Sequence, residues 1–319
     1  MTMTGCTSKL VITSAAGCVA GLLGGINCSK DSEIVITDCV NLGNVTGTAY
    51  VGGICGYVSI ASAANVSIKI TDCYNGAEEI APAIKATEEN GRVGGILGSV
   101  DVRGADFTLE INGCDNYGTV DAEVGPYASG ILSIYTTGAK TTGTGHKITV
   151  TACNNFGDVS AKEYGAGGIV ATLADTVRAG DTAPTEANWA QLNITKCANY
   201  GAVSAVKDSV GGIIGVIFNG GSANYAKINA TELYNEGAVS GTSWVGSIIG
   251  VVRPPVRDAE TLEIPVTYSD WMNANENGDK LFGAIGTSLV DEKVSKWTVS
   301  NMYNKTGEEI FAATTTNDI

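Results

Sequence analysis

The chain has 319 residues, of which 42 are glycine, 44% are hydrophobic and only 16% are charged, and its net charge is −14. This composition excludes a disordered chain and a collagen. The acidic surplus provides no electrostatic footprint for nucleic acid or an anionic membrane, and no apolar run is long enough for a transmembrane helix. We therefore expect no nucleic-acid partner and no membrane insertion, and no signal peptide is visible at the start.

One pattern, apolar-x-apolar-x-x-Cys-x-Asn, repeats along the chain. Its Cys column contains only apolar residues: Ala15, Cys39, Cys73, Cys114, Cys153, Cys197, Leu233, Trp271 and Met302. Two residues later come Gly17, Asn41, Asn75, Asn116, Asn155, Asn199, Asn235, Asn273 and Asn304. In most repeats Gly and Val follow at further even offsets, as at Gly201 and Val203. Even offsets place all four residue types on one face of an extended chain.

A second block, Gly-Gly-Ile-x-small, follows in each repeat. Its Ile column is Ile26, Ile54, Ile96, Ile131, Ile169, Ile213, Ile248 and Ile285. Both blocks, and the apolar pair before each Cys, alternate with period two, which is typical of strands, and no segment has a sustained helical period. The sequence predicts three short strands per repeat, separated by Gly- and Asn-rich turns, and almost no helix.

Repeats of this kind predict an all-β fold, a single-stranded parallel β-helix of eight to nine coils, with right-handed winding favoured by the general handedness of parallel crossovers. We expect repeats over residues 1–252 and, over 253–319, degenerate coils or a cap continuous with the solenoid. The longer repeats carry insertions on one side of the solenoid, at 59–67, 101–108, 136–147, 174–191, 218–227 and 253–263, and one repeat has a second insertion near 80–91.

The two repeating columns have structural interpretations. Apolar residues replace Cys freely in its column, which indicates buried free thiols and not disulfides. Cys6, Cys18 and Cys55 lie outside this column, and their state is open. Stacked Asn amides are expected to bond to one another and to the turn backbone, since a buried amide must be hydrogen-bonded.

An aromatic strip is the candidate binding surface. Tyr117, Phe156 and Tyr200 occupy one outward position, between Asn and Gly, in three successive repeats. Stacked about 5 Å apart, they form an apolar strip for sugar rings or a partner protein. The alternative is a hydrophobic ladder shielded by the insertions. A second set, Tyr50, Tyr127 and Trp244, is not contiguous.

Signals for catalysis or cofactor binding are weak. Asp38 and Asp72 precede the Cys in adjacent repeats, which makes them a weak candidate for a metal site or an acid pair, or else solvated outward residues. The one histidine, His146, lies in a Gly/Thr-rich insertion and is expected to be solvated. No zinc-ligand spacing, phosphate loop or nucleophile elbow is present, so we expect no cofactor.

Two stretches carry a family resemblance. They are Cys197-Ala-Asn-Tyr-Gly-Ala-Val203 with Val210-Gly-Gly-Ile-Ile-Gly215, and Cys39-Val-Asn-Leu-Gly-Asn-Val45 with Val51-Gly-Gly-Ile-Cys-Gly56. They resemble the GLUG-type repeat of bacterial secreted and cell-surface proteins, over about residues 10–310. The resemblance implies a secreted or surface β-solenoid, often within a larger adhesin-like protein, and it supplies no catalytic residues. Trp271 and Met302 depart from the pattern.

The leading hypothesis is thus a non-enzymatic bacterial surface or secreted solenoid, acting as an adhesin, a spacer or a rod that binds a host or cell-surface glycan or protein. One alternative is a polysaccharide lyase or hydrolase on the same scaffold, using insertion acids such as Asp175 or Asp181. Another is a structural filament or tail-fibre segment.

Overall fold

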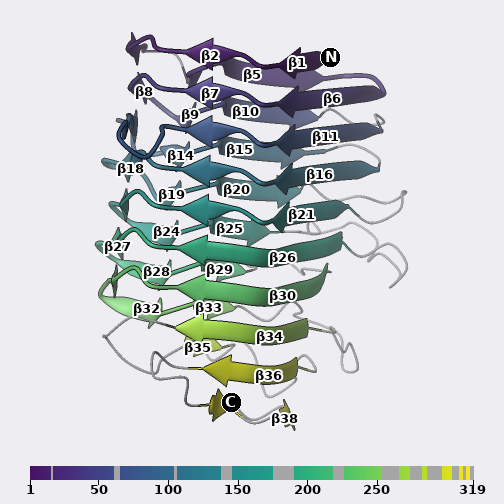
Figure 1. The fold of residues 1–319 in the computed structure, drawn as a ribbon, viewed down its shortest axis with the longest axis vertical. Coiled ribbons are helices and arrows are strands. Elements are labelled where there is room, and N and C mark those ends of the chain that lie inside the picture. The colour runs from purple at the N-terminus through teal and green to yellow at the C-terminus, as the bar shows by residue number, and fades with distance from the viewer. Residues whose placement is uncertain are drawn as a thin grey trace.

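The computed structural model describes residues 1–15, 17–60, 65–103, 106–137, 146–174, 190–217, 226–252, 266–273, 282–285, 297–303, 309–311 and 314–316. Throughout these residues the chain forms strands and turns, with no helix. The strands stack coil upon coil along one axis, from the N-terminus to the C-terminus (Figure 1). The predicted parallel β-helix is confirmed.

Each coil passes through four sheets, as the second coil illustrates. Its chain runs through β6 (Ser32–Thr37) and the short β7 (Val40–Asn41) in sheet A, β8 (Val45–Gly47) in sheet B, β9 (Tyr50–Gly52) in sheet C and β10 (Cys55–Ile60) in sheet D. The sequence predicts three strands per coil. The structure has more because the chain turns at the paired glycines, so one predicted strand becomes a strand of sheet C and a strand of sheet D.

The remaining strands repeat this order. Sheet A also contains β1 (Thr2–Thr4), β2 (Thr7–Ser8), β11 (Val66–Thr71), β12 (Tyr74–Asn75), β16 (Phe107–Asn112), β17 (Asp115–Asn116), β21 (Lys147–Thr151), β22 (Asn154–Asn155), β26 (Ala190–Asn199), β30 (Ala226–Asn235), β34 (Val266–Asn273), β36 (Trp297–Tyr303), β37 (Glu309–Phe311) and β38 (Thr314–Thr316). Sheet B also contains β3 (Ile12–Thr13), β13 (Ala83–Ala86), β18 (Thr119–Ala122), β23 (Val159–Ala161), β27 (Val203–Ala205) and β31 (Val239–Ser240). Sheet C also contains β4 (Cys18–Ala20), β14 (Arg92–Gly94), β19 (Tyr127–Ser129), β24 (Tyr164–Gly167), β28 (Asp208–Gly211) and β32 (Ser243–Gly246). Sheet D also contains β5 (Leu23–Cys28), β15 (Leu97–Val102), β20 (Leu132–Thr137), β25 (Val170–Ala174), β29 (Ile214–Ile217), β33 (Ile249–Val252) and β35 (Phe282–Ile285).

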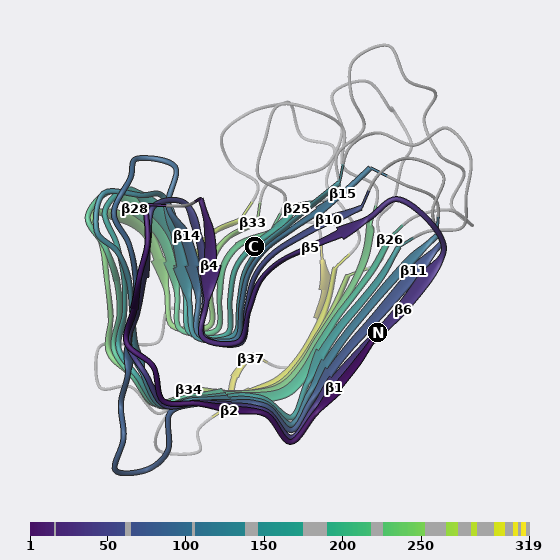
Figure 2. The ribbon, with the colours of Figure 1, turned by 90° about the horizontal axis from the view of Figure 1, so that it is seen from above.

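The winding is right-handed. Seen from the N-terminal end, the chain runs clockwise from β1 to β2 and on through sheets B, C and D while it recedes from the viewer (Figure 2). In the side view the front strands of sheet A run from right to left, in agreement with this sense (Figure 1). The general handedness of parallel crossovers therefore holds here.

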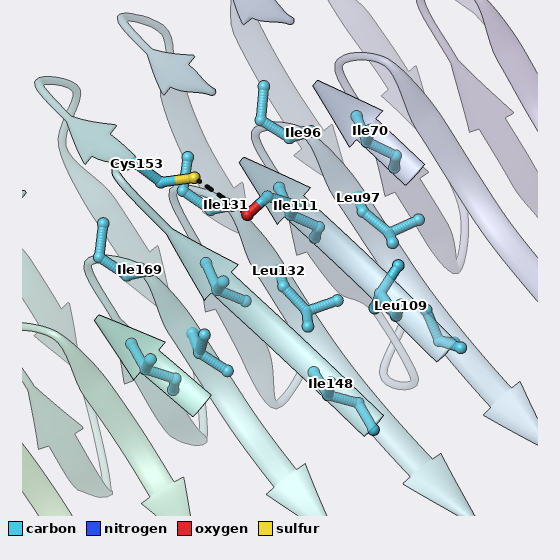
Figure 3. Close-up of a cluster of buried hydrophobic side chains, with 14 of the residues drawn as sticks. Ile70, Ile96, Leu97, Leu109, Ile111, Ile131, Leu132, Ile148, Cys153 and Ile169 are labelled. Atoms are coloured by element: carbon cyan, nitrogen blue, oxygen red, sulfur yellow. Dashed lines mark hydrogen bonds between the residues drawn. The ribbon is translucent and has the colours of Figure 1, made fainter. Parts of the chain in front are cut away.

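The coil has two arms, each with its own core (Figure 2). Between sheets A and D lies a core of Ile, Leu, Val and Cys side chains, part of which Figure 3 shows. Between sheets B and C lies a smaller core, mainly of Val and Ala. Each side chain packs against the same position one coil away, so burial depends on neighbouring coils.

A ladder of asparagine side chains accompanies the stack. Asn41, Asn75, Asn116, Asn155, Asn199 and Asn235 are all fully buried. Five bonds link the six, because each Nδ2 from Asn41 to Asn199 donates to Oδ1 of the next Asn at 2.7–2.8 Å. Most also donate to the glycine carbonyl two residues on, as Asn155 does to Gly157 at 2.8 Å. This confirms the predicted structural ladder, in which buried amides satisfy both one another and the turns.

The Cys column is confirmed from Cys39 to Cys197. Its five thiols are 0–1% exposed. All nine cysteines of the chain are free, with no disulfide among them. Each Sγ donates to the carbonyl two residues before it, as Cys153 does to Thr151 at 3.2 Å. Cys153 also donates to Ile111 of the preceding coil at 3.7 Å (Figure 3).

The predicted columns are wrong at both ends of the stack. Thr7 and Ser8 pair with Val40 and Asn41, which puts Cys6 and Ser8, and not Ala15 and Gly17, in the Cys and Asn columns of the first coil. Leu23 pairs with Cys55, so Leu22 and not Ile26 belongs to the Ile column. Gly24-Gly25-Ile26 imitates the motif, but the turn lies earlier, where the Gly21 amide donates to the Gly53 carbonyl at 3.0 Å.

The last predicted Ile is also out of register. Ile285 pairs with Val252, four residues beyond Ile248. Trp271 and Met302 do occupy one column, since they pair with each other in sheet A. Strands β34, β35 and β36 continue the parallel stack, whereas β37 and β38 pair antiparallel with β36. The division at residue 252 stays a prediction.

Most insertions lie between a strand of sheet D and the next strand of sheet A, as predicted, and these strand ends share one side of the solenoid (Figure 2). Strands extend into the predicted range 101–108 from both sides. The segment 80–91 is not one insertion, because β13 in its middle is a regular strand of sheet B. Asp175, Asp181 and Asn304 lie outside the described residues.

Candidate functional site

The three predicted aromatic residues form a continuous stack. Each follows a buried Asn of the ladder and therefore points outward from the end of a strand of sheet A. The ring centroids of Tyr117 and Phe156 are 4.7 Å apart with an interplanar angle of 13°. Those of Phe156 and Tyr200 are 5.0 Å apart at 4°. The separation follows from the spacing of neighbouring parallel strands, about 4.8 Å.

A fourth ring extends this stack. Tyr234, in β30, has its ring centroid 5.7 Å from that of Tyr200 at an angle of 50°. The sequence columns do not predict it, because Tyr234 precedes its Asn, whereas the other three follow theirs. The period-two alternation does indicate its outward position, because both neighbours of an inward residue point outward. We call Tyr117, Phe156, Tyr200 and Tyr234 the aromatic ladder.

The aromatic ladder is open to solvent along its length, but it shows ring edges. Phe156 is 40% exposed and Tyr200 is 43% exposed. Both faces of the Phe156 ring are covered by its neighbours, so the exposed part is its edge. The apolar strip expected from the sequence is therefore a row of ring edges.

Acidic and amide groups border the aromatic ladder. Asn154 donates through Nδ2 to the Asp115 carboxylate at 2.9 Å. Burial raises the pKa of Asp115, and the hydrogen bonds from Asn154 oppose this. Burial, followed by the charges of Asp115 and Glu78, raises the pKa of Tyr117. At the other end, the Tyr234 hydroxyl donates to Glu236 at 2.9 Å.

A turn lies beside the N-terminal end of the aromatic ladder. Gly76 has φ +92°, and a Cβ there would lie 2.9 Å from the Tyr117 Cβ. Ile80, in the same turn, is 44% exposed. This turn and the ladder thus form one partly apolar surface.

Asp38 and Asp72 lie at one bend in adjacent coils. Their φ values are 54° and 50°, in the left-handed region that Asp tolerates better than most residues. Both are exposed, and a Cβ at Gly113, one coil on, would meet the Asp72 carboxylate. Across the described residues, no group of three or more His, Cys, Asp or Glu side chains is placed to hold a metal ion. The bend accounts for both residues without a ligand.

His146 is not solvated. It is 4% exposed, and its ring makes an edge contact with Phe107 at a centroid distance of 6.0 Å. Since Thr108 pairs with Lys147, His146 takes the inward position that Phe107 has one coil before. The prediction is wrong because the strand of sheet A begins before the insertion pattern suggests.

The second aromatic set is interrupted. Tyr50 and Tyr127 lie in one column of sheet C, but Arg92 stands between them. The Arg92 guanidinium carbon lies 5.3 Å from the Tyr50 ring centroid, and Tyr50 stacks on Tyr57 of sheet D at 4.5 Å. Trp244 is at a bend with φ 53°. The Tyr50–Tyr57 stack thus joins sheets C and D, and Arg92 continues the column within sheet C.

Burial makes the Cys55 and Cys153 thiols unsuited to nucleophilic chemistry. Burial raises the pKa of the Cys55 thiol to about 12. Burial, reinforced by the neighbouring thiols, also raises the pKa of Cys153. Because the thiolate is the nucleophile, these groups stay protonated and inert near neutral pH.

In comparisons with known proteins, no family model, no curated protein and no solved structure matches the chain. The resemblance to the GLUG-type repeat thus stays a prediction. In the part of the chain that the structure describes, no helix is long and apolar enough to cross a membrane.

Proposed function

We propose that this chain is a non-enzymatic rod of a bacterial surface or secreted protein, and that it binds an extended glycan along the aromatic ladder. One observation supports the proposal. Four aromatic side chains from four successive coils form one row parallel to the solenoid axis, with its two middle rings exposed and its two end rings half-buried. A row of this kind suits a chain-like ligand that repeats a contact from coil to coil.

The chemistry of the row suits sugar hydroxyls. Ring edges carry partial positive charge and favour electron-rich atoms such as hydroxyl oxygens. The tyrosine hydroxyls, the Asp115–Asn154 pair and Glu236 supply donors and acceptors beside the rings. An apolar surface with a few placed polar groups is typical of small-molecule sites. The bordering carboxylates favour an uncharged glycan over an acidic one.

Binding to a glycan array tests the proposal. Phe156→Ala and Tyr200→Ala should each abolish the signal of a glycan that the wild-type chain binds. Tyr164→Ala is the matched control, because Tyr164 is 37% exposed in sheet C and lies off the ladder. Equal binding by all three variants contradicts the proposal. If the ladder instead captures only a cell-surface protein, the chain is still a binding rod, but its ligand is a protein and not a glycan.

A further inference from the structure

The edge geometry of the aromatic ladder has a second consequence. An aromatic ring carries negative partial charge on its faces and positive charge on its edge, so an edge is attracted to the face of another ring. Inside the ladder the faces of Phe156 are already covered, at 4.7 and 5.0 Å. The edges of Phe156 and Tyr200 remain open, with 40% and 43% of these residues exposed.

We propose that the aromatic ladder binds elongated, planar aromatic molecules without negative charge, which lie along the solenoid axis with one face on the ring edges. Each rung then makes an edge-to-face contact with the ligand, the arrangement that aromatic pairs prefer over a face-to-face sandwich. From Tyr117 to Tyr234 the row spans three coil spacings, or about 14 Å. Two or three linked ring systems cover this length.

The charge of the surroundings restricts the ligand. Asp115 lies next to the ladder, and the charges of Asp115 and Glu78 act on Tyr117. Glu236 accepts a hydrogen bond from Tyr234 at the other end. Asp158 accepts one from the backbone amide of Ala202, two residues after Tyr200. With a net charge of −14 on the chain, a cationic or neutral ligand is favoured and an anionic one is repelled.

This ligand class goes beyond the proposed glycan, although both use the same edges. The two proposals fail separately. A ladder that binds planar aromatics but no glycan leaves this inference intact and overturns the proposed function. A ladder that binds a glycan but no planar aromatic supports the proposed function and overturns this inference.

Thioflavin T, a cationic, elongated and planar dye, is the probe. Its fluorescence is titrated with the wild-type chain and with Phe156→Leu and Tyr200→Leu, which keep apolar bulk but remove the ring. Each variant should bind the dye about three- to ten-fold more weakly, since one edge-to-face contact is lost. Tyr164→Leu, off the ladder, should leave the Kd unchanged. Thermal unfolding of each variant, followed by circular dichroism, verifies that it is folded.

Congo red, an anionic planar dye, should bind more weakly than thioflavin T. Three results overturn the inference: no saturable thioflavin T binding by the wild-type chain, the same Kd for the folded Phe156→Leu and Tyr200→Leu variants as for the wild type, or an equal loss on Tyr164→Leu. Preference for Congo red overturns the charge argument.

Discussion

One backbone position in each of the first seven coils takes a left-handed conformation whichever residue occupies it. The φ values lie between 50° and 64° at Gly5, Asp38, Asp72, Gly113, Ala152, Lys196 and Glu232. In most of these coils the bend separates the long strand of sheet A from the short strand that carries the ladder Asn, whereas in β26 and β30 it lies within one strand. Asp and Gly fit it well, but Ala, Lys and Glu are strained there, because a Cβ disfavours this region.

Ala152→Gly should therefore stabilise the chain. The relief of left-handed strain exceeds the extra entropy that Gly loses on folding, which leaves a gain of about 0.5–1 kcal/mol in the free energy of unfolding. Ala161→Gly, at the C-terminal end of β23, should lose a similar amount, since the extended backbone there gives Gly no strain to relieve. Urea unfolding measures the free energy of unfolding of both variants. Destabilisation by Ala152→Gly would mean that the bend is not left-handed.

The asparagine ladder should be sensitive to a single interior change. Asn155→Leu removes the bonds to Asn116, Asn199 and the Gly157 carbonyl, which leaves buried polar groups without partners. We expect a loss of about 1–3 kcal/mol. Asn193→Leu, on the outer face of sheet A, should change stability by less than about 0.5 kcal/mol. Equal effects of the two substitutions in urea unfolding would exclude a buried ladder.

Repetition is what makes single residues predictable in this chain. The burial of Cys114 or Asn155 follows from the same residue type recurring at even offsets in many repeats. The burial of His146 cannot be predicted in this way, because no repeat of the motif defines where its strand begins. Tyr234 shows the same limit, since its ring joins a ladder from a neighbouring column.

At the scale of strands, glycine pairs set the path of the chain. In the regular coils the second glycine of the pair packs against an Asn of the ladder, as Gly53, Gly95, Gly168 and Gly212 do, so the two residue types require each other. At Gly168 a Cβ would overlap the Asn199 amide and the Gly212 carbonyl. Neither backbone nor a buried amide yields easily to such an overlap.

Gly168→Ala should hence cost about 3 kcal/mol or more. The matched control is Gly25→Ala in β5, where the nearest atoms to a new Cβ are 3.7 Å away. That change should stay within about 1 kcal/mol of wild type. Thermal unfolding distinguishes the two variants. If Gly168→Ala melts like wild type, the ladder does not pack behind this glycine.

Sheet C carries a feature that the repeat pattern does not predict. From β24 onward its strands have four residues where β9, β14 and β19 have three. The extra residue is Gly165, Ser209 or Trp244, each with positive φ. Such a bulge inserts one residue without changing the core alternation on either side. Sequence periodicity alone cannot place it, since the inward columns keep their spacing from the glycine pair.

Thiol reactivity should follow position in the stack. Cys18 in β4 is exposed, whereas Cys39, Cys73, Cys114, Cys153 and Cys197 are buried. In the native chain, iodoacetamide at pH 8 should modify Cys18 first, and the five column thiols only after unfolding. Mass spectrometry of tryptic peptides gives the order. Modification of Cys153 as fast as Cys18 would contradict the buried column.

For the whole molecule, stability is a sum of contacts between neighbouring coils. Sheet A continues in parallel register from β1 to β36, and β37 and β38 then pair antiparallel with its last strand. The sequence predicts this stacking because like residues recur. The end coils are harder to predict from the sequence, because Ser8 replaces Asn in the first coil and the last coils match the motif only in part.

The distance between two outward residues of sheet A tests the stack most directly. Lys69 and Asn229 are linked by register through Glu110, Thr149 and Asn193, four coil spacings in all. Spin labels are attached at Lys69→Cys and Asn229→Cys, in a Cys6→Ser/Cys18→Ser background that removes the two cysteines that are not buried. They should give a narrow electron–electron distance distribution centred at about 20 Å. A broad distribution, or one centred well beyond 30 Å, about one and a half times the span of these coils, would contradict the parallel stack of coils.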